Sequence, residues 1–430
     1  MSSEKKLIPL RRFPEFSQDE AWKEKTFGDL FTFLPNNTLS RAELKEGEGE
    51  VYNVHYGDIL IKLNAYTDIQ KGELPTIKTI QDITKYLNAR LCDGDIVIAD
   101  TAEDETVGKC TEIVNTKETI VVSGLHTIPS RPRIKFAQAY LGYYMNSNSF
   151  HNKLRPIMQG VKVTSISKTA IQNVSLSFPK SLEEQKKIAD CLTTIDSYIS
   201  SINEKIEQLK AHKKSLMQKL FPQNGQTIPE YRFPEFKQNG AWSKARLGDV
   251  TTVVNRRNRS NRSLPIYSIS NVDGFIPQSE QFNGLDSNNR GYDISMYKIV
   301  GKNTFAYNPA RINVGSIGYS GELTEILVSS LYVCFKTTDE IDDRFLMCFL
   351  NTTHFNQAVE SNVEGGIRSY LFYENFSRIN IAYPSLEEQI KIASTIMTLD
   401  TLISDYTNKK TLLEGHKKGL TQQLFPIITK

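Results

Sequence analysis

The chain has 430 residues, which is too long for one ordinary hydrophobic core, so two or more domains are expected. Its composition, 39% hydrophobic and 23% charged, is typical of a globular protein and excludes collagen-like and disordered classes. A formal net charge of +3 is only mildly basic, so any nucleic-acid surface must be local. There is no apolar leader or membrane-length apolar stretch, and the five cysteines are scattered without metal-ligand spacing. We therefore expect a cytoplasmic protein with reduced thiols and no metal site.

Several short segments occur twice along the chain. Three pairs lie 220 residues apart: "RFPEF" at 12–16 and 232–236, the two tryptophans Trp22 and Trp242, and "FGDL" at 27–30 with "LGDV" at 247–250. The blocks that follow, roughly residues 23–160 and 243–366, show no convincing match to each other. A solenoid would repeat its whole unit at a constant period. The chain instead repeats its flanking motifs, as a frame, around two blocks of unrelated sequence. This suits a protein that holds two different recognition domains in one fixed relation.

Each repeat ends in a long predicted helix. "SLEEQ" at 181–185 returns 204 residues later at 385–389, and "AHKKSLMQKLFP" returns as "GHKKGLTQQLFP" in the same register. Ser181 with Glu184, and Ser385 with Glu388, have the spacing of capping boxes, in which the Glu reaches back to the N-cap backbone. The first helix is expected to run from residue 182 to 220.

Apolar residues recur in both helices at steps of four and three, as in a coiled coil. The positions are Ile188, Leu192, Ile195, Ile199, Ile202, Ile206 and Leu209 in the first helix, and Ile392, Ile396, Leu399, Ile403 and Leu413 in the second. A single seam of this kind could equally be buried against its own domain. Two seams of the same length favour antiparallel packing of one helix on the other. Tyr406 and Lys410 interrupt the second seam, where Leu402 or Leu412 is expected to take over.

Sequence motifs for catalysis are missing. There is no phosphate-binding glycine loop, and "NPAR" at 308–311 lacks the second proline and the aromatic residue of the amino-methyltransferase tetrad. His126 has no matched acid or nucleophile in the sequence, so a structural role is expected. The acidic stretch 100–106 lacks EF-hand spacing and is expected to be a solvated loop. We identify no catalytic residues.

Positive charge is concentrated in a few places that could contact nucleic acid. "NRRNRSNRS" at 255–263 contains Arg256, Arg257, Arg259 and Arg262 without any acid, and a solvated loop is an equally good interpretation. "SRPRIKF" places Arg131, Arg133 and Lys135 at alternate positions, on one face if the stretch is extended. A charge-protected edge strand would have the same pattern.

A glycine followed by a basic residue occurs late in each block. Gly160 precedes Lys162, and Gly366 precedes Arg368, each pair eighteen or nineteen residues before the proline that leads into the long helix. Glycine permits a close backbone approach, after which the cation can meet a phosphate. The recurrence makes both basic residues candidates for DNA contact.

Taken together, these motifs resemble the specificity subunit of a type I restriction–modification enzyme, over nearly the whole chain. The doubled "RFPEF…W…GD", "SLEEQ" and "HKK…LFP" are its strongest carriers. "DGDIVIADTAEDETVGK" and "GLHTI" in the first block, and "FAYNPARINVGSIGY" in the second, also read like family target-recognition sequence. The last of these adds Arg311, beside Tyr307, as a further candidate DNA contact.

The resemblance implies an α/β (α+β) architecture with a pseudo-two-fold internal repeat. Two target-recognition domains would be separated by two long antiparallel coiled-coil helices that set an unspecified spacer. The expected divisions are 1–22 (repeat segment), 23–178 (domain 1), 179–222 (helix), 223–242 (linker and repeat segment), 243–383 (domain 2) and 384–430 (helix).

The resemblance also implies partners that carry the chemistry. Double-stranded DNA with a bipartite site would be bound together with two methyltransferase subunits holding S-adenosylmethionine, in a bacterial or archaeal cytoplasm. Two motor–nuclease subunits using ATP and Mg²⁺ could join them, and no cofactor is expected on this chain. The alternatives are an enzyme with an unrecognised divergent nuclease or methyltransferase motif, and a coiled-coil assembly scaffold.

Overall fold

The computed structural model describes residues 7–72, 74–160, 162–223, 225–362 and 370–426. These residues form two compact units. The first extends to Asn203 and resumes at Asn408, and the second is Glu204–Thr407. Each unit therefore contains part of both long helices.

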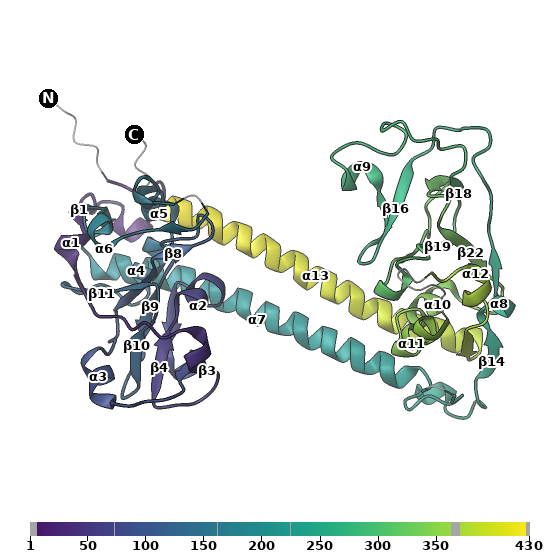
Figure 1. Cartoon of the computed structure of the whole chain (residues 1–430), viewed down its shortest axis with the longest axis horizontal. Helices are drawn as coiled ribbons and strands as arrows, with labels where there is room; N and C mark the ends of the chain where they lie inside the picture. Colours follow the sequence, from purple (N-terminus) through teal and green to yellow (C-terminus); the bar gives the residue numbers. More distant parts are fainter. Residues whose placement is uncertain (1–6, 73, 161, 224, 363–369, 427–430) are drawn as a thin grey trace. The chain divides into compact units, whose positions relative to one another are not determined.

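The two long helices are continuous and equal in length. Helix α7 (Leu182–Leu220) and helix α13 (Leu386–Leu424) each have 39 residues, and α7 has the bounds that its sequence predicts (Figure 1). Lys219 lies in the last turn of α7, where the helix dipole favours a cation, whereas the last turn of α13 contains no basic residue.

Within the first unit the helices run antiparallel. The Lys417 Nζ lies 2.5 Å from the Asp196 Oδ1, and the Lys410 Nζ donates to the Asn203 Oδ1 at 2.7 Å. A step of seven residues toward the C-terminus of α7 thus corresponds to a step of seven residues toward the N-terminus of α13. Lys410 stays in the seam by bonding a polar partner, whereas Leu402 and Leu412 are 40% and 74% exposed. The expectation that one of these leucines replaces Lys410 is wrong.

The second unit pairs its parts of the two helices in the same sense. The Lys213 Nζ lies 2.5 Å from the Asp400 Oδ1, and Leu220 shares a core with Ile392 and Ala393.

The predicted seam positions are all removed from solvent to some degree. Six are buried and six are half-buried: Ile188, Leu192, Ile202, Ile206, Ile392 and Ile396, and then Ile195, Ile199, Leu209, Leu399, Ile403 and Leu413. The first turns of each helix also belong to the core of their own domain, through Ile188 and Leu192 in one and Ile392 and Ile396 in the other. Burial against the domain, the alternative to helix pairing, therefore applies at these ends.

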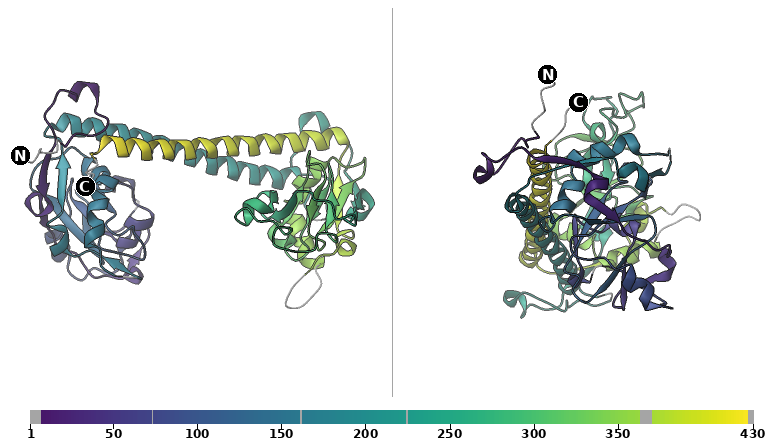
Figure 2. Two further views of the ribbon diagram at one scale, coloured as in Figure 1. Left: turned by 90° about the horizontal axis from the view of Figure 1, so that it is seen from above. Right: turned by 90° about the vertical axis from the view of Figure 1, so that its left-hand side faces the viewer.

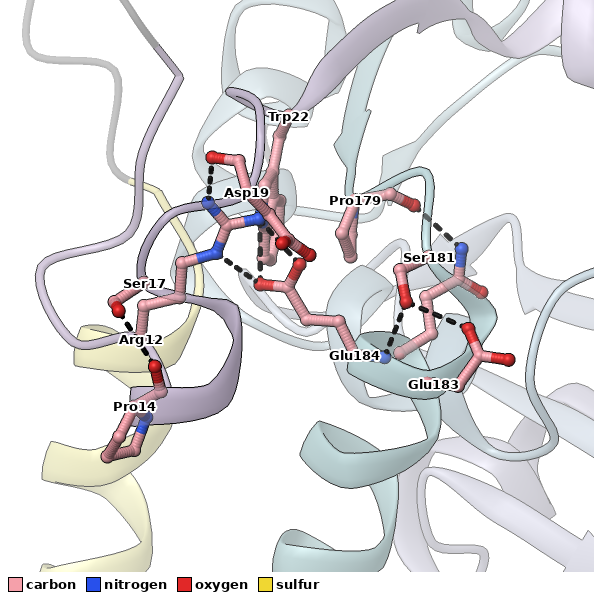
Figure 3. Close-up of polar contacts among 10 residues, drawn as sticks. Arg12, Pro14, Ser17, Asp19, Trp22, Pro179, Ser181, Glu183 and Glu184 are labelled. Atoms are coloured by element: carbon pink, nitrogen blue, oxygen red, sulfur yellow. Dashed lines mark hydrogen bonds and ion pairs between the residues drawn. The ribbon is translucent and has the colours of Figure 1, made fainter.

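The duplicated motifs contact each other in the first unit. The guanidinium of Arg12 donates through Nε and Nη2 to the two carboxylate oxygens of Glu184, at 2.8 and 2.7 Å (Figure 3). The Trp22 indole N–H donates to the same carboxylate at 3.3 Å, and Arg12 also donates to the Asp19 carbonyl at 2.8 Å. We call the pair of Arg12 and Glu184, with its counterpart in the second repeat, the frame clamp.

The second repeat builds the same clamp. Arg232 donates to both carboxylate oxygens of Glu388 at 2.8 and 2.7 Å, and each glutamate side chain is only 1% exposed. The capping-box expectation is therefore wrong for the Glu184 side chain, although the Ser181 hydroxyl accepts from the Glu184 backbone N–H at 3.1 Å. A buried carboxylate is stabilised by an opposite charge in a two-bond fork, which a single backbone N–H cannot supply.

A glutamine in each "SLEEQ" attaches the start of its helix to the neighbouring domain. The Gln185 amide donates to the Pro179 carbonyl and accepts from the Ala137 N–H, both at 2.9 Å. Gln389 makes the equivalent bonds with Pro384 and Asp342, again at 2.9 Å.

The domain of the first unit contains two mixed sheets. One has the order β2 (Phe31–Phe33), β11 (Thr127–Pro132), β7 (Ile96–Ala99), β9 (Cys110–Val114), β5 (Tyr66–Asp68), and the other β10 (Ile120–Ser123), β4 (Val51–Val54), β6 (Thr76–Ile77), β3 (Leu44–Lys45). Two small pairs join β1 (Lys23–Thr26) to β13 (Ser175–Phe178) and β12 (Thr164–Ser165) to β8 (Thr101–Ala102). The helices are α1 (Phe27–Leu30), α2 (Tyr56–Ile61), α3 (Ile83–Asn88), α4 (Tyr140–Met145), α5 (Asn148–Leu154) and α6 (Lys168–Ile171).

The domain of the second unit follows a related plan. Its sheets have the orders β15 (Thr251–Val253), β22 (Val333–Thr337), β19 (Phe305–Tyr307), β20 (Ile317–Tyr319), and β17 (Gly274–Pro277), β16 (Ile266–Ser270), β21 (Ile326–Val328), β18 (Lys298–Val300). The pair β14 (Ser243–Arg246) and β23 (Asn380–Tyr383) corresponds to β1 and β13. The helices are α8 (Leu247–Val250), α9 (Gln278–Gln281), α10 (Asp343–Phe349), α11 (Thr353–Asn362) and α12 (Tyr373–Phe376).

The two blocks thus share a topology although their sequences do not match. The antiparallel run β2-β11-β7-β9 corresponds to β15-β22-β19-β20, and each second sheet contains one parallel pair, β4 with β10 or β16 with β21. Strand β5 extends the first run, and no strand of the described residues extends the second run beyond β20.

The segment after α7 takes the place in the second unit that the N-terminal segment takes in the first. The Tyr231 N–H donates to the Lys219 carbonyl at 2.9 Å, and the Arg11 N–H donates to the Gln423 carbonyl at the same distance. The C-terminal end of α13 therefore lies against the N-terminal segment in the first unit (Figure 2).

Candidate nucleic-acid interface

The arginine-rich stretch of the second domain is an ordered loop between β15 and β16. Asn258 is fully buried, and its side chain accepts from the Arg262 N–H and donates to the Arg262 carbonyl, both at 2.9 Å. The Asn258 N–H donates to the Tyr297 carbonyl at 2.8 Å, and Asn261 has a φ of 48°. A buried asparagine that bonds its own loop holds the backbone in one shape. We call residues 255–263 the arginine loop.

Two of the four arginines in this loop are paired with an acid that the local sequence does not contain. The Glu325 carboxylate lies 2.9 Å from the Arg256 Nη1 and 2.5 Å from the Arg262 Nη2. Hydrogen bonding from Arg262 lowers the pKa of the Glu325 carboxyl. As expected, the loop's own sequence contains no acid. The folded loop nevertheless has an acidic neighbour, because the fold brings in a carboxylate from the residue before β21.

The other two arginines are less committed. The Arg257 Nη1 lies 3.8 Å from the Met296 sulfur, and the exposed Arg259 has no ion pair within the part of the chain that the structure describes.

A further arginine, Arg290, lies outside the arginine loop. Its guanidinium lies 4.4 Å from the Phe282 ring and 5.2 Å from the Tyr292 ring. Aromatic faces attract guanidinium groups and also stack on bases. Sequence reasoning missed this cluster, because no periodicity marks Phe282, Arg290 and Tyr292.

The basic residues of the first domain have different surroundings. Arg131 donates to both carboxylate oxygens of Asp95 at 2.9 and 2.7 Å, and the Asp95 side chain is 1% exposed. Strand β11 ends at Pro132, so Arg133 and Lys135 lie beyond it, and Arg133 donates to the Thr32 hydroxyl at 3.1 Å. The expectation that all three lie on one face of an extended strand is wrong, because the strand stops one residue after Arg131.

These three residues nevertheless border one hollow of about 1050 Å³. Its lining also contains several carboxylates: Asp68, Asp93, Asp95, Glu112, Glu183 and Asp190. A wall of this mixed charge repels phosphate more than the arginine loop does.

The remaining candidates are single residues. Gly160 has a φ of 115°, and a Cβ there would lie 1.9 Å from the Val163 carbonyl oxygen, so the turn before the exposed Lys162 requires glycine. Arg311 is exposed, whereas Tyr307 beside it is fully buried and does not form part of a binding surface. Arg368 lies outside the described residues.

His126 occupies a strained turn before β11. Its φ is 54°, its Nδ1 lies 3.4 Å from the Asp100 carboxylate, and its ring packs edge-on against Tyr56 at 5.3 Å. Among the described residues, no group of three or more His, Cys, Asp or Glu side chains is arranged to hold a metal ion. In the same residues, no helix has the length and apolar character needed to cross a membrane.

Comparison with known proteins matches the geometry. The model of the type I restriction modification DNA specificity domain matches residues 19–211 and 239–414, one match for each repeat. Two Methanocaldococcus jannaschii proteins are similar to the chain. The type I restriction enzyme MjaX specificity subunit is 27% identical, with 83% of each chain covered, and the MjaVIII specificity subunit is 25% identical, with 63% of this chain and 66% of that one covered.

Two solved structures have the same fold at 14% identity. The type I restriction-modification S subunit from M. genitalium matches with a TM-score of 0.59 over 98% of this chain and 100% of that one. A chain from a study of complex assembly in the type I R-M system matches with a TM-score of 0.55 over 94% and 97%.

Proposed function

The chain belongs to the family of type I restriction–modification DNA specificity proteins, and we propose that each of its domains reads one half of a bipartite, asymmetric DNA site. The observation that carries the proposal is the duplicated frame. Identical clamps and equivalent strand orders support two domains whose exposed charged loops differ.

Exchange of one domain tests this reading. Replacing residues 23–160 with the corresponding block of another family member changes one half of the methylated sequence and leaves the other half unchanged. Methylome sequencing of a host that expresses the chain with its methyltransferase partner gives both halves. A change in both halves contradicts the modular reading.

In the second domain, the arginine loop supplies the basic DNA surface of this proposal. Most of its contacts are to phosphate, since phosphate and sugar take half or more of the hydrogen bonds in protein–DNA interfaces. Lys162, exposed beside a strained glycine, belongs to the same class in the first domain. The variant with Arg256, Arg257, Arg259 and Arg262 all changed to Ala then loses affinity for every DNA, and its salt dependence flattens. Wild-type affinity and slope in this variant would show that DNA binds elsewhere.

The two long helices set the spacer in this scheme. Two polar pairs, Asp196 with Lys417 and Asn203 with Lys410, flank Ile199 on α7 and Leu413 on α13. A heptad inserted after Ile199 alone breaks the register. Heptads inserted at both positions keep it and add about 10.5 Å, or roughly three base pairs of rise. An unchanged spacer in the double insertion excludes the ruler role.

The chemistry belongs to partners in this proposal. Two methyltransferase subunits bring S-adenosylmethionine, two motor–nuclease subunits bring ATP and Mg²⁺, and this chain is not catalytic. Equilibrium binding of labelled S-adenosylmethionine to the isolated chain tests the division, and saturable binding there would favour an enzyme.

A further inference from the structure

Glu325 lies between two arginines of the arginine loop. One carboxylate oxygen is 2.9 Å from Arg256 and the other is 2.5 Å from Arg262. One acid thus pairs with two of the arginines that the proposed function assigns to DNA binding.

The backbone at Glu325 is in a conformation that L side chains rarely adopt. Its φ is 35°, in the left-handed region that favours glycine or asparagine. The next residue is already fixed, because Ile326 pairs with Val300 and Leu327 pairs with Ile266. Strain of this kind persists where the surroundings enforce it and is concentrated at functional sites.

The contact is open to solvent and can be exchanged. The Glu325 side chain is 37% exposed, and those of Arg262 and Arg256 are 41% and 59% exposed. Carboxylate and phosphate bind guanidinium in the same way, through charge-assisted hydrogen bonds. A DNA phosphate arriving at this loop therefore competes with Glu325 for the same N–H groups.

We propose that Glu325 is an autoinhibitory contact, which occupies Arg256 and Arg262 as a substitute for phosphate until the correct site displaces it. The inference rests on the proposed function, since it requires the arginine loop to face DNA. Nonspecific binding depends almost wholly on phosphate contacts, so it cannot offset the loss of the Glu325 pairs. A cognate duplex also makes base contacts, which do offset that loss.

The test compares Glu325→Gln with a matched control in the same turn. Glu322→Gln makes the same change in charge three residues away, but Glu322 pairs with Lys302 rather than with the loop. Both full-length variants, assembled with the methyltransferase subunits, are titrated with salt on two duplexes: the one that methylome sequencing identifies and a scrambled one. Thermal unfolding of each variant confirms that it is folded.

Glu325→Gln is expected to raise affinity for the scrambled duplex by on the order of tenfold and to steepen its salt slope by about 1–2, since up to two phosphate contacts are gained. The slope on the cognate duplex stays the same, because the same phosphates are contacted there. The affinity for the cognate duplex rises at least as much as that for the scrambled duplex, because in the wild-type protein only the cognate duplex bears the cost of displacing Glu325, and Glu322→Gln changes neither slope.

Three results would overturn the inference. Equal effects of Glu325→Gln and Glu322→Gln would show a general effect of charge. Weaker binding of Glu325→Gln to both duplexes would show that Glu325 only positions the arginines. No effect of Glu325→Gln, while the double variant Arg256→Gln/Arg262→Gln still loses affinity, would remove this role and leave the proposed function intact. If the double variant binds both duplexes normally, the arginine loop is not the DNA surface, and the proposed function is then wrong at that point.

Discussion

The two domains place their acidic side chains differently. The variable block of the first buries three carboxylates, Asp58, Asp95 and Glu112, whereas the described residues of the second block, 243–362 and 370–383, bury no Asp or Glu. As a result, Arg131 of the first domain is held by a buried acid, and Arg256 and Arg262 of the second share an exposed one. The burial of its partner, rather than the type of residue, decides whether an arginine stabilises the fold or remains available to a ligand.

The frame clamps provide the baseline for this comparison, because the two-bond Arg–Glu pair has the same geometry in both units, although the Trp22 N–H also donates to Glu184 while the Trp242 N–H has no partner among the described residues. Arg12→Ala and Arg232→Ala each leave a buried glutamate without its counter-charge, which costs about 3–5 kcal/mol of unfolding free energy. Trp22 and Trp242 are the chain's two tryptophans, one in each unit, so replacing one by Phe allows fluorescence to follow the other unit during urea unfolding. Adding Glu184→Gln to Arg12→Ala recovers part of the loss. If Arg12→Ala and Arg232→Ala both destabilised the same unit, the two clamps would not be equivalent.

The buried Glu112 makes the stability of the first unit dependent on pH. Burial raises the pKa of its carboxyl from 4.5 to about 7, although backbone N–H groups of Ala139 and Gly142 bond it. The folded chain then binds more protons than the unfolded chain between these two values. The stability from neutral Glu112 is present below the lower value and is lost as pH rises through the upper one.

The expected loss is up to about 3 kcal/mol between pH ~4.5 and ~7. Urea unfolding followed through Trp22 should show it, and Glu112→Gln should remove the dependence. Unfolding followed through Trp242 is the internal control. A first unit whose stability is the same at both pH values would contradict the assignment.

Arg131→Ala separates the two roles of arginine most directly. Among the described residues it leaves the buried Asp95 carboxylate with the Cys92 N–H as its one hydrogen-bond partner, at a cost of about 1–3 kcal/mol. Arg256→Ala breaks an exposed pair and should cost less than about 1 kcal/mol. Thermal unfolding of the two single variants measures both effects, and equal losses would remove the distinction.

The smallest effect on stability is expected at Arg259, together with a clear effect on DNA binding. Arg259→Ala should flatten the salt dependence by about one unit without changing the melting temperature, because the side chain is exposed and makes no ion pair with the described residues. Salt titration on cognate and scrambled duplexes measures the slope, with Arg131→Ala as the variant expected to leave it unchanged. A change in slope for Arg131→Ala instead would move the DNA surface into the first domain's hollow.

Local features of the chain were predictable from sequence. The bounds of α7 follow from a serine N-cap and an apolar period, and the repeat is visible because "RFPEF" and "SLEEQ" are written twice. The helix bounds depend on residues within a few turns of one another and the repeat depends on identical short segments, so the order of residues alone determines both. The same spacing also misled: Lys410 appeared to break the seam, whereas Asn203 on the other helix accepts its hydrogen bond.

The partner of each arginine depended on the tertiary structure. Arg12 meets Glu184 across 172 residues, Arg131 meets Asp95 across 36, and Arg262 meets Glu325 across 63. No periodicity connects residues so far apart, and the two domains reach a common strand order with unrelated side chains. Sequence alone therefore determined the frame and the family, while the fold decided which cations are neutralised inside a domain and which remain at its surface. The physical reason is that the energy of a charge depends on its neighbours in space and on its access to water.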